Sequence, residues 1–598
     1  MGRTKAFFEK RKIYVSVAVL AGMTLFTFFL CIARFGIKNV DESFYLSIPY
    51  RLMNGDSLFT DEWHVSQLSG LLLLLPMKLF LLLTGSADGI ILFFRQLYAV
   101  IKLIFYGYIC YKLRREKYWG IFAAVLFSVF DYLQYAVLNY YTMTAMGAVI
   151  VGFILFDPNG LKPNRGKLVF AGIVVACMVL AEPPAALLYF LYAETTLVFF
   201  LLRRKKKNVG AYPFDGNTFW FLTAGIFIVF AVFAVYFLCT VDIGEFAKNF
   251  PMLFTDSEYR FGADGGNVLE ISAIGEIANL LGIVPLCLCA VLFFAGTVFV
   301  KRRKLPVFVV FTGHLLLFAC ELIRMLVKYS VGLEFLIGST FFPLLFSFFG
   351  LACFTLTEKK EKGLLTFWLF VLLLSLPVDI GSACAVFSCL CVSCIPSVLM
   401  IKNFFAECQK RNAEKKYKVR SGKKYIAALT ALTLCVSAVS LSCYLYERTE
   451  WTRFEIPAFA NASQASEKGP LKGIYTASEM KNNYELALED LDYIKSVSDG
   501  MLYVANLCPW YYFYTGLDVG TYTAYYVEAD GIDRNRAYWE LHPEKIPDTV
   551  FVPFFDAADY RFPKDPEKLF GSKIFGLFDG DVKKLNTGYL IEHAKYKG

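Results

Sequence analysis

Apolar runs long enough to span a lipid bilayer recur along the chain as far as residue 446. A transmembrane helix needs about 20 apolar residues to cross the roughly 30 Å hydrocarbon layer, and the first run, 13–33, meets that length. Application of the positive-inside rule run by run predicts a polytopic α-helical membrane protein with about thirteen transmembrane helices. The expected spans are 13–33, 93–112, 118–136, 142–156, 168–182, 184–202, 218–239, 277–300, 305–323, 334–356, 364–377, 380–401 and 425–446.

One further apolar segment, 68–83, is not counted as a crossing. It contains Pro76 and Lys78, and an additional crossing here would place the basic run 112–117 outside the cell. We therefore expect a re-entrant or surface-lying helix on the outer face. The basic N-terminus lacks a convincing cleavage site, which predicts an uncleaved signal anchor with a cytoplasmic N-terminus.

The pattern changes after residue 446 to a polar, mixed sequence, which parity of the spans places outside the cell. We call residues 447–598 the tail and predict a small extracytoplasmic α/β domain for it, attached to a transmembrane domain of residues 1–446. Residues 459–473 are the nearest thing to a hinge. The expected elements are a helix with Ser478 as its N-terminal cap, strands at 501–506, 521–527 and 549–553, and a helix at 534–541.

Composition supports a membrane protein and argues against nucleic-acid binding. Hydrophobic residues make up 57% of the 598 residues, more than one water-soluble core can hide. The net charge is +9, but the basic residues cluster in short runs between the spans, where they read as topology signals. Most of the 16 cysteines lie within predicted spans, where a thiol acts as a small apolar side chain.

Two long connections are expected outside, the first long loop (34–94) and the second long loop (241–276). Long loops between packed elements are more often functional than connective. The first begins close to the acidic pair Asp41-Glu42 and continues through a predicted helix, 42–54, that ends at Gly55. The plain alternative is that the two acids only cap this helix and favour its dipole.

The sequence motifs of the first long loop, in the order in which they follow one another, resemble those of the GT-C glycosyltransferases. This class includes the protein O-mannosyltransferases and the lipid A aminoarabinose transferase. The matching stretches are 41–45, 51–56 and 61–64, which precede an apolar helix. The motif covers about 60 residues, and the arrangement of spans extends the likeness over residues 1–446.

The resemblance implies an integral membrane enzyme of the cell envelope, as in bacteria. Such an enzyme transfers a sugar, with inversion, from a polyprenyl-phosphate donor to a glycan, lipid or protein acceptor on the outer face. Asp41 matches the family's general base, which takes the proton of the attacking acceptor hydroxyl. Glu42 is then expected to orient Asp41 or to bind a divalent cation; no cofactor is certain.

The leaving phosphate requires positive charge or hydrogen-bond donors, because negative charge grows on it as the glycosidic bond breaks. His64 falls at the family's His or Lys position, although Val65 and Ser66 replace the prolines that often follow it. Arg95 resembles the Arg that opens the second span, with an interfacial, snorkelling arginine as the plain alternative. The weaker candidates for phosphate or acceptor binding are Arg260, Arg324 and Lys328.

The sequence departs from the family in the short outer turn 138–142. Many members carry an acidic residue there, whereas this chain has Asn139, a further candidate for phosphate or acceptor binding that would supply a hydrogen bond without charge. That difference weakens the case for a tightly bound metal.

The aromatic stretch 510–514 in the tail suits either sugar stacking or a buried core. Two other functions compete with glycosyl transfer: a transporter or flippase of a lipid-linked glycan, and a non-catalytic envelope assembly protein.

Overall fold

The fold is taken from a computed structural model, in which most of the bundle and the tail can be described. The described residues are 2–36, 41–130, 136–157, 162–205, 212–255, 346–379 and 389–413, then 464–525, 531–554 and 574–598, with single gaps at 348, 352 and 507. The predicted spans 277–300, 305–323 and 425–446 lie outside the described residues.

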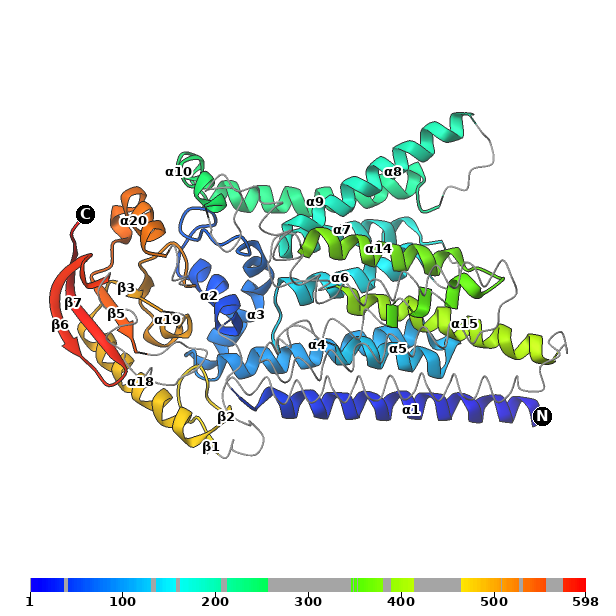
Figure 1. The fold of residues 1–598 in the computed structure, drawn as a ribbon, viewed down its shortest axis with the longest axis horizontal. Coiled ribbons are helices and arrows are strands. Elements are labelled where there is room, and N and C mark those ends of the chain that lie inside the picture. Colours follow the sequence, from blue (N-terminus) through cyan, green and yellow to red (C-terminus); the bar gives the residue numbers. More distant parts are fainter. Residues whose placement is uncertain are drawn as a thin grey trace, which may run out of the picture.

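Long apolar helices form a bundle (Figure 1). Their length and apolar composition identify the chain as a membrane protein. Four of them, among the described residues, are long and apolar enough to cross a bilayer, namely 12–33, 90–112, 183–202 and 216–240. The bundle helices are α1 (Gly2–Ala33), α4 (Ile90–Lys112), α5 (Tyr118–Val129), α6 (Tyr140–Leu155), α7 (Arg165–Ala181), α8 (Ala186–Lys205), α9 (Gly216–Thr240), α14 (Lys362–Asp379) and α15 (Cys394–Ala413).

The two ends of the bundle are distinct. Figure 1 places the N-terminus at one end and the tail at the other. At the N-terminal end Lys402 of α15 is ion-paired with Glu116, which follows α4. Two connections expected on the cytoplasmic side, 112–117 and the run beginning at Lys402, therefore lie at the same end of the molecule, as the charge pattern requires.

The first long loop folds at the tail end of the bundle into two helices. Helix α2 (Asp41–Met53) ends two residues before Gly55, where the chain changes direction. Gly55 has φ +104°, a backbone conformation that glycine adopts without strain. Helix α3 (Leu68–Thr84) packs on α2, and Gly70 permits the contact because a Cβ there would overlap Ile48. Figure 1 shows α3 beside α2, and its Leu75 and Leu82 are exposed, as expected of a helix lying in lipid.

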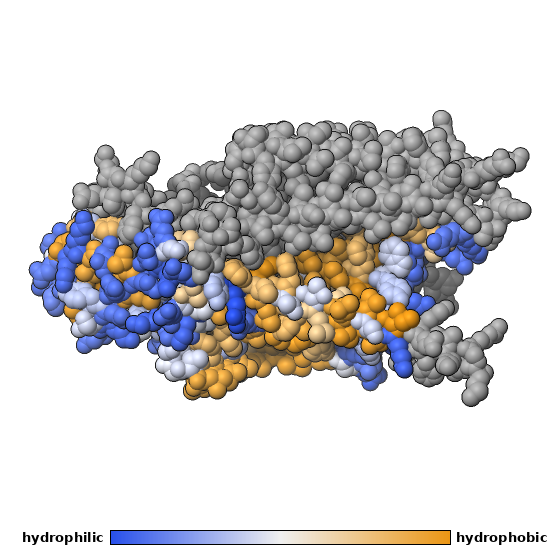
Figure 2. All heavy atoms as spheres, turned by 90° about the horizontal axis from the view of Figure 1, so that it is seen from below, coloured by the Kyte–Doolittle hydropathy of each residue, from blue (hydrophilic) through white to orange (hydrophobic). Residues whose placement is uncertain are grey.

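On the face seen in Figure 2, apolar side chains predominate over the described part of the bundle, while hydrophilic side chains gather over the tail. Helix α1 exposes Ile13, Leu20 and Met23. Exposed apolar side chains on helices of this length and composition are expected of a surface that contacts lipid.

Helices α7 and α9 cross with their backbones in contact. Gly172 of α7 faces Leu222 and Gly225 of α9, and a Cβ on Gly172 would overlap the Leu222 carbonyl oxygen. A Cβ on Gly225 would likewise overlap the carbonyl oxygen of Val169. Small residues allow such close approach in membranes, where packing and not hydrophobic burial drives helix association.

The tail is built around a mixed five-stranded sheet of order β4-β3-β5-β7-β6. Strand β3 pairs in parallel with β4 and β5, whereas β7 pairs antiparallel with β5 and β6. The strands are β3 (Met501–Val504), β4 (Asp518–Val519), β5 (Thr549–Pro553), β6 (Phe578–Lys584) and β7 (Gly588–Tyr596). The helices of the tail are α18 (Ser478–Val497), α19 (Trp510–Thr515) and α20 (Gly531–Leu541).

Several elements of the tail match the sequence expectations and others do not. The helix after residue 477 and the strands at 501–504 and 549–553 are present. Ser478 is the first helical residue and not the cap, since Ala477 occupies the N-cap position. Residues 521–525 are not a strand, because their backbone instead bonds to the first long loop.

The start of the described tail is fixed to the bundle by backbone hydrogen bonds. The short hairpin of β1 (Gln464–Ala465) and β2 (Tyr475–Thr476) bonds through Tyr475 to Arg34 and Gly36, just after α1. Its turn bonds through Gly469 to Gly89, before α4. Residues 464–473, expected to belong to a hinge, are thus held on both sides.

Gly172→Ala is expected to destabilise the bundle by about 1–3 kcal/mol, because the added methyl must displace the backbone of α9. Gly107→Ala in α4 is the matched control, since no atom lies within 4 Å of its Cβ position and alanine favours a helix. Thermal unfolding of the purified protein in detergent measures both. Equal stability of the two variants would contradict the close α7–α9 crossing.

Candidate functional site

A buried ion pair joins the start of α2 to α4. Arg95 donates from Nε and Nη2 to Glu42 Oε2, at 2.8 and 2.6 Å, and both side chains are at most 2% exposed. Arg95 Nη1 also donates to the carbonyl oxygens of Ala33 and Gly36, and Glu42 Oε1 accepts from the Ala136 amide at 3.1 Å. One ion pair therefore ties together the end of α1, the start of α2, α4 and the segment that precedes α6.

This arrangement decides two alternatives that the sequence left open. Glu42 is more than a cap for α2, since both of its carboxylate oxygens bond to groups outside that helix. Arg95 does not snorkel to an interface, because it is buried and shares its donors between a carboxylate and two carbonyl groups. With its oxygens engaged in this way, Glu42 is poorly placed to ligate a cation.

Asp41 lies beside this pair in the first turn of α2 and is half-buried. One turn further along the same helix face come Phe44 and Tyr45. Phe44 contacts the rings of His64 and Tyr525, with centroid distances of 4.6 and 4.9 Å, and Tyr45 lies 5.4 Å from Tyr140. Aromatic rings from the first long loop, the tail and α6 thus surround the helix face that begins at Asp41.

His64 is buried and neutral in this arrangement. Its Nδ1 accepts a hydrogen bond from the backbone amide of Ser66 at 3.1 Å, with the Ser66 hydroxyl at 2.8 Å. An amide can only donate, so the ring proton resides on Nε2. His64 can therefore supply a neutral N–H donor, and not the positive charge that its sequence position suggested.

A charged cluster around Arg51 of the first long loop fastens the tail. Arg51 is buried and donates to Asp56 at 2.6 Å, to Glu62 at 3.0 Å and to the carbonyl oxygen of Thr521 in the tail at 3.1 Å. Lys545 of the tail completes the cluster through Asp56 at 2.6 Å. Sequence reasoning placed Arg51 and Asp56 in a family motif but had no signal for this structural role.

The ionisation of this cluster follows from burial and pairing. Burial raises the pKa of Asp56, but Arg51 and Lys545 outweigh it and hold the pKa below its usual range. Burial also raises the pKa of Glu62, and here it outweighs the opposing effect of Arg51. Burial lowers the pKa of Arg51, yet Asp56 and Glu62 together raise it above its ordinary value, so Arg51 stays charged.

A second junction joins both long loops to the tail. Helix α10 (Ile243–Asn249) follows α9, and its Asn249 Oδ1 accepts from Trp63 Nε1 at 3.0 Å and from His542 Nε2 at 2.9 Å. The indole N–H can only donate, which fixes the orientation of the Asn249 amide. His542 therefore joins the tail to the second long loop.

Asn139 has a local role in α6. Its side-chain Oδ1 accepts a hydrogen bond from the backbone amide of Thr142 at 2.8 Å. The backbone amide of Asn139 donates to the Thr142 hydroxyl at 2.9 Å, which completes a reciprocal N-terminal cap. The side chain is fully buried, and its Nδ2 has no partner among the described residues.

The aromatic stretch 510–514 fills the core of the tail in place of presenting a sugar platform.

Three candidates fall outside the described residues, so the structure does not place them: Arg260, Arg324 and Lys328. Within the described ranges, no group of three or more His, Cys, Asp or Glu side chains is arranged to hold a metal ion.

No protein-family model matches the sequence, and no curated protein is significantly similar to it. The structure is similar to an archaeal oligosaccharyltransferase, AglB from Archaeoglobus fulgidus, which belongs to the GT-C class of membrane glycosyltransferases. The AglB complex with an inhibitory peptide and a dolichol-phosphate gives a TM-score of 0.41 at 12% identity, covering 91% of this chain and 70% of AglB.

A second structure, the Archaeoglobus fulgidus oligosaccharyltransferase with Zn and sulfate, gives a TM-score of 0.38 at 12% identity, covering 94% of this chain and 72% of that one. At these scores the likeness assigns neither an activity nor a substrate to this chain.

Arg51→Met is expected to loosen the tail from the bundle and to cost about 3–5 kcal/mol, because it leaves Glu62 buried without a cation and Asp56 with Lys545 alone. Lys597→Met removes an exposed ion pair to Asp579 and should cost less than about 1 kcal/mol. Hydrogen exchange at residues 518–525, together with thermal unfolding, separates the two. Unchanged protection of 518–525 in Arg51→Met would contradict the fastening role.

Proposed function

We propose that the chain is a membrane glycosyltransferase that moves a sugar from a polyprenyl-phosphate donor to an acceptor on the outer face, with inversion. The observation that carries the proposal is the Arg95–Glu42 pair, which fixes the start of α2, where the neighbouring Asp41 is half-buried one helical turn before Phe44 and Tyr45. Residues 41–64 also keep the order of residues that resembles the GT-C glycosyltransferases.

Asp41 acts as the general base in this proposal. As the acceptor hydroxyl oxygen attacks the anomeric carbon, the Asp41 carboxylate takes its proton. The bond between the anomeric carbon and the carrier phosphate breaks on the opposite face of the sugar, and its electron pair remains on the phosphate oxygen. The products are the glycosylated acceptor with inverted configuration and the polyprenyl phosphate.

The role of Glu42 and Arg95 in this proposal is to hold Asp41 in place. Because the Arg95–Glu42 pair joins α1, α2, α4 and the segment before α6, it holds the peptide that carries Asp41 against four parts of the chain. A general base must stay within hydrogen-bonding reach of the proton it takes, and a rigid support of this kind maintains that reach.

The proposed location follows from the charge pattern and the two ends of the bundle. With the N-terminus in the cytoplasm, the tail and both long loops lie outside, and Asp41 lies at that outer end. The lipid part of the donor then remains in the bilayer while its sugar reaches α2. The acceptor is a glycan, a lipid or a protein of the cell envelope.

Asp41→Asn tests the proposal. The amide cannot take a proton, so sugar transfer from radiolabelled polyprenyl-phosphate hexoses into acceptor should fall by about 10²–10⁴-fold while the protein stays folded. Extraction of the lipid and aqueous products after incubation with membranes that contain the protein measures the transfer.

Asp242→Asn is the matched control, since Asp242 caps α10 at the start of the second long loop and asparagine caps a helix equally well. This variant should keep full transfer. Equal activity of Asp41→Asn and wild type would refute the catalytic role and favour a flippase or an assembly protein, both of which should tolerate the change.

A further inference from the structure

The carrier phosphate requires donors that the known charged residues do not provide. Arg95 directs two of its nitrogens to Glu42 and the third to carbonyl oxygens. His64 is neutral. Lys102, two turns further along α4, donates to the carbonyl oxygens of Ser128 and Phe130 at the end of α5. Both cations, Arg95 and Lys102, are therefore already bound to groups of the protein, and His64 contributes no charge.

The N-terminus of α6 faces the start of α2 and carries a donor to spare. The Ala136 amide, three residues before Asn139, binds Glu42, and Tyr140 packs against Tyr45 of α2. Asn139 is 0% exposed, and its Nδ2 has no partner among the described residues. Because Oδ1 of the same carboxamide caps Thr142, this N–H₂ group lies at the positive end of the helix.

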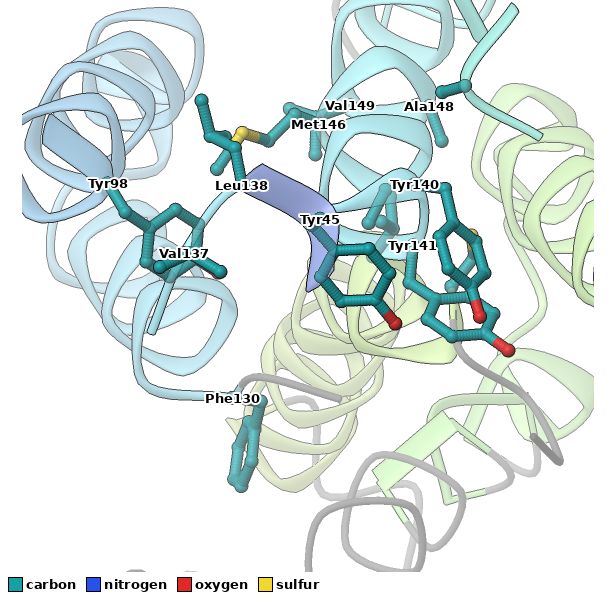
Figure 3. Packing of buried hydrophobic residues seen from close by; sticks show 14 of the residues in the cluster. Tyr45, Tyr98, Phe130, Val137, Leu138, Tyr140, Tyr141, Met146, Ala148 and Val149 are labelled. Atoms are coloured by element: carbon teal, nitrogen blue, oxygen red, sulfur yellow. The ribbon is translucent and has the colours of Figure 1, made fainter. Parts of the chain in front are cut away.

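Three tyrosines extend the cluster of donors. Figure 3 shows the hydroxyl groups of Tyr45, Tyr140 and Tyr141 directed to the same side, where α2 meets the first turn of α6. The Tyr140 and Tyr141 rings lie 4.0 Å apart between centroids. Side chains in the first turn of a helix point back toward its N-terminus, so both hydroxyl groups lie toward the same end of α6 as Asn139.

We propose that the N-terminus of α6 is a phosphate subsite made of neutral donors: the Asn139 side-chain amide and the hydroxyl groups of Tyr45, Tyr140 and Tyr141. It takes the phosphate group of a polyprenyl phosphate. A helix N-terminus of this kind binds phosphate through its dipole and its oriented N–H groups. The assignment rests on the proposed glycosyl transfer for its role, but it can be tested without it.

The position of the subsite agrees with the proposed reaction. Asp41 and Tyr45 are four residues apart on one face of α2, a separation of about 6 Å along the helix axis, close to the width of a sugar ring. A sugar between them has the base on one side and its phosphate on the other, as inversion requires. Neutral donors also hold the extra negative charge of the released carrier less firmly than a cation does, which favours product release.

Asn139→Asp is the decisive variant, because aspartate keeps the helix cap through its oxygen and replaces the N–H₂ donor by a negative oxygen. Binding of a short polyprenyl phosphate, farnesyl phosphate, to the purified full chain is measured by isothermal titration calorimetry. We expect it to weaken about ten- to a hundredfold, the loss typical of a hydrogen bond to a charged group. Asn164→Asp, the same substitution at the N-cap of α7, should leave binding unchanged.

Tyr140→Phe with Tyr141→Phe removes both hydroxyl groups and keeps the rings, and should weaken binding in the same direction. It decides the matter should Asn139→Asp fail to fold. Inorganic phosphate is titrated in parallel: tight binding of farnesyl phosphate alone identifies a lipid headgroup, and equal binding of both identifies a general phosphate site. Binding that stays within twofold of wild type in Asn139→Asp, or in the double variant, overturns the subsite.

The outcome is separable from that of the proposed function. Asp41→Asn should bind farnesyl phosphate as well as the wild type does, because Asp41 lies on the side of the sugar away from the phosphate. Loss of binding in Asn139→Asp together with full transfer by Asp41→Asn supports the subsite and refutes the general base. Unchanged binding in Asn139→Asp together with loss of transfer in Asp41→Asn does the opposite.

Discussion

The buried pair of Arg95 and Glu42 is the contact on which the candidate site depends. Removing two charges from water is costly, and an ion pair offsets that cost only when its remaining donors and acceptors are also satisfied. Here Arg95 reaches two carbonyl oxygens at the end of α1, and Glu42 accepts the amide of Ala136. The pair thereby holds the end of α1, the start of α2, α4 and the segment before α6 together. Asp41, at the start of α2, lies at this junction.

The charged residues of the first long loop divide into two groups with different tasks. Asp41 and Glu42 belong to the start of α2 and to the bundle. Asp56 and Glu62 surround Arg51 and, with Lys545, hold the tail. Because Arg51 donates to the carbonyl group of Thr521, close to Tyr525, the same cluster also positions the tail ring that contacts Phe44 and His64.

The sequence predicts elements whose pattern is local and misses contacts that join distant segments. Helical spacing of apolar residues predicts the helix at 478–497, and a short apolar run predicts the strand at 549–553, which is buried at every position. The hairpin of β6 and β7 was missed, because β6 has one buried residue and an otherwise exposed, polar sequence. Arg95, the partner of Glu42, is 53 residues away, and Thr521, the tail partner of Arg51, is 470 residues away; no spacing rule reveals such pairs.

His64 shows why residue type alone is a poor guide to charge. A histidine at a phosphate-facing position suggests a cation, yet one backbone amide, that of Ser66, fixes its tautomer and keeps it neutral. Asn139 shows the converse. It replaces the acidic residue of many GT-C members, and its buried side-chain amide at the N-terminus of α6 has a donor without a partner among the described residues, which the proposed subsite uses. In a site of low dielectric, hydrogen-bond donors held in place stabilise that charge without carrying any of their own.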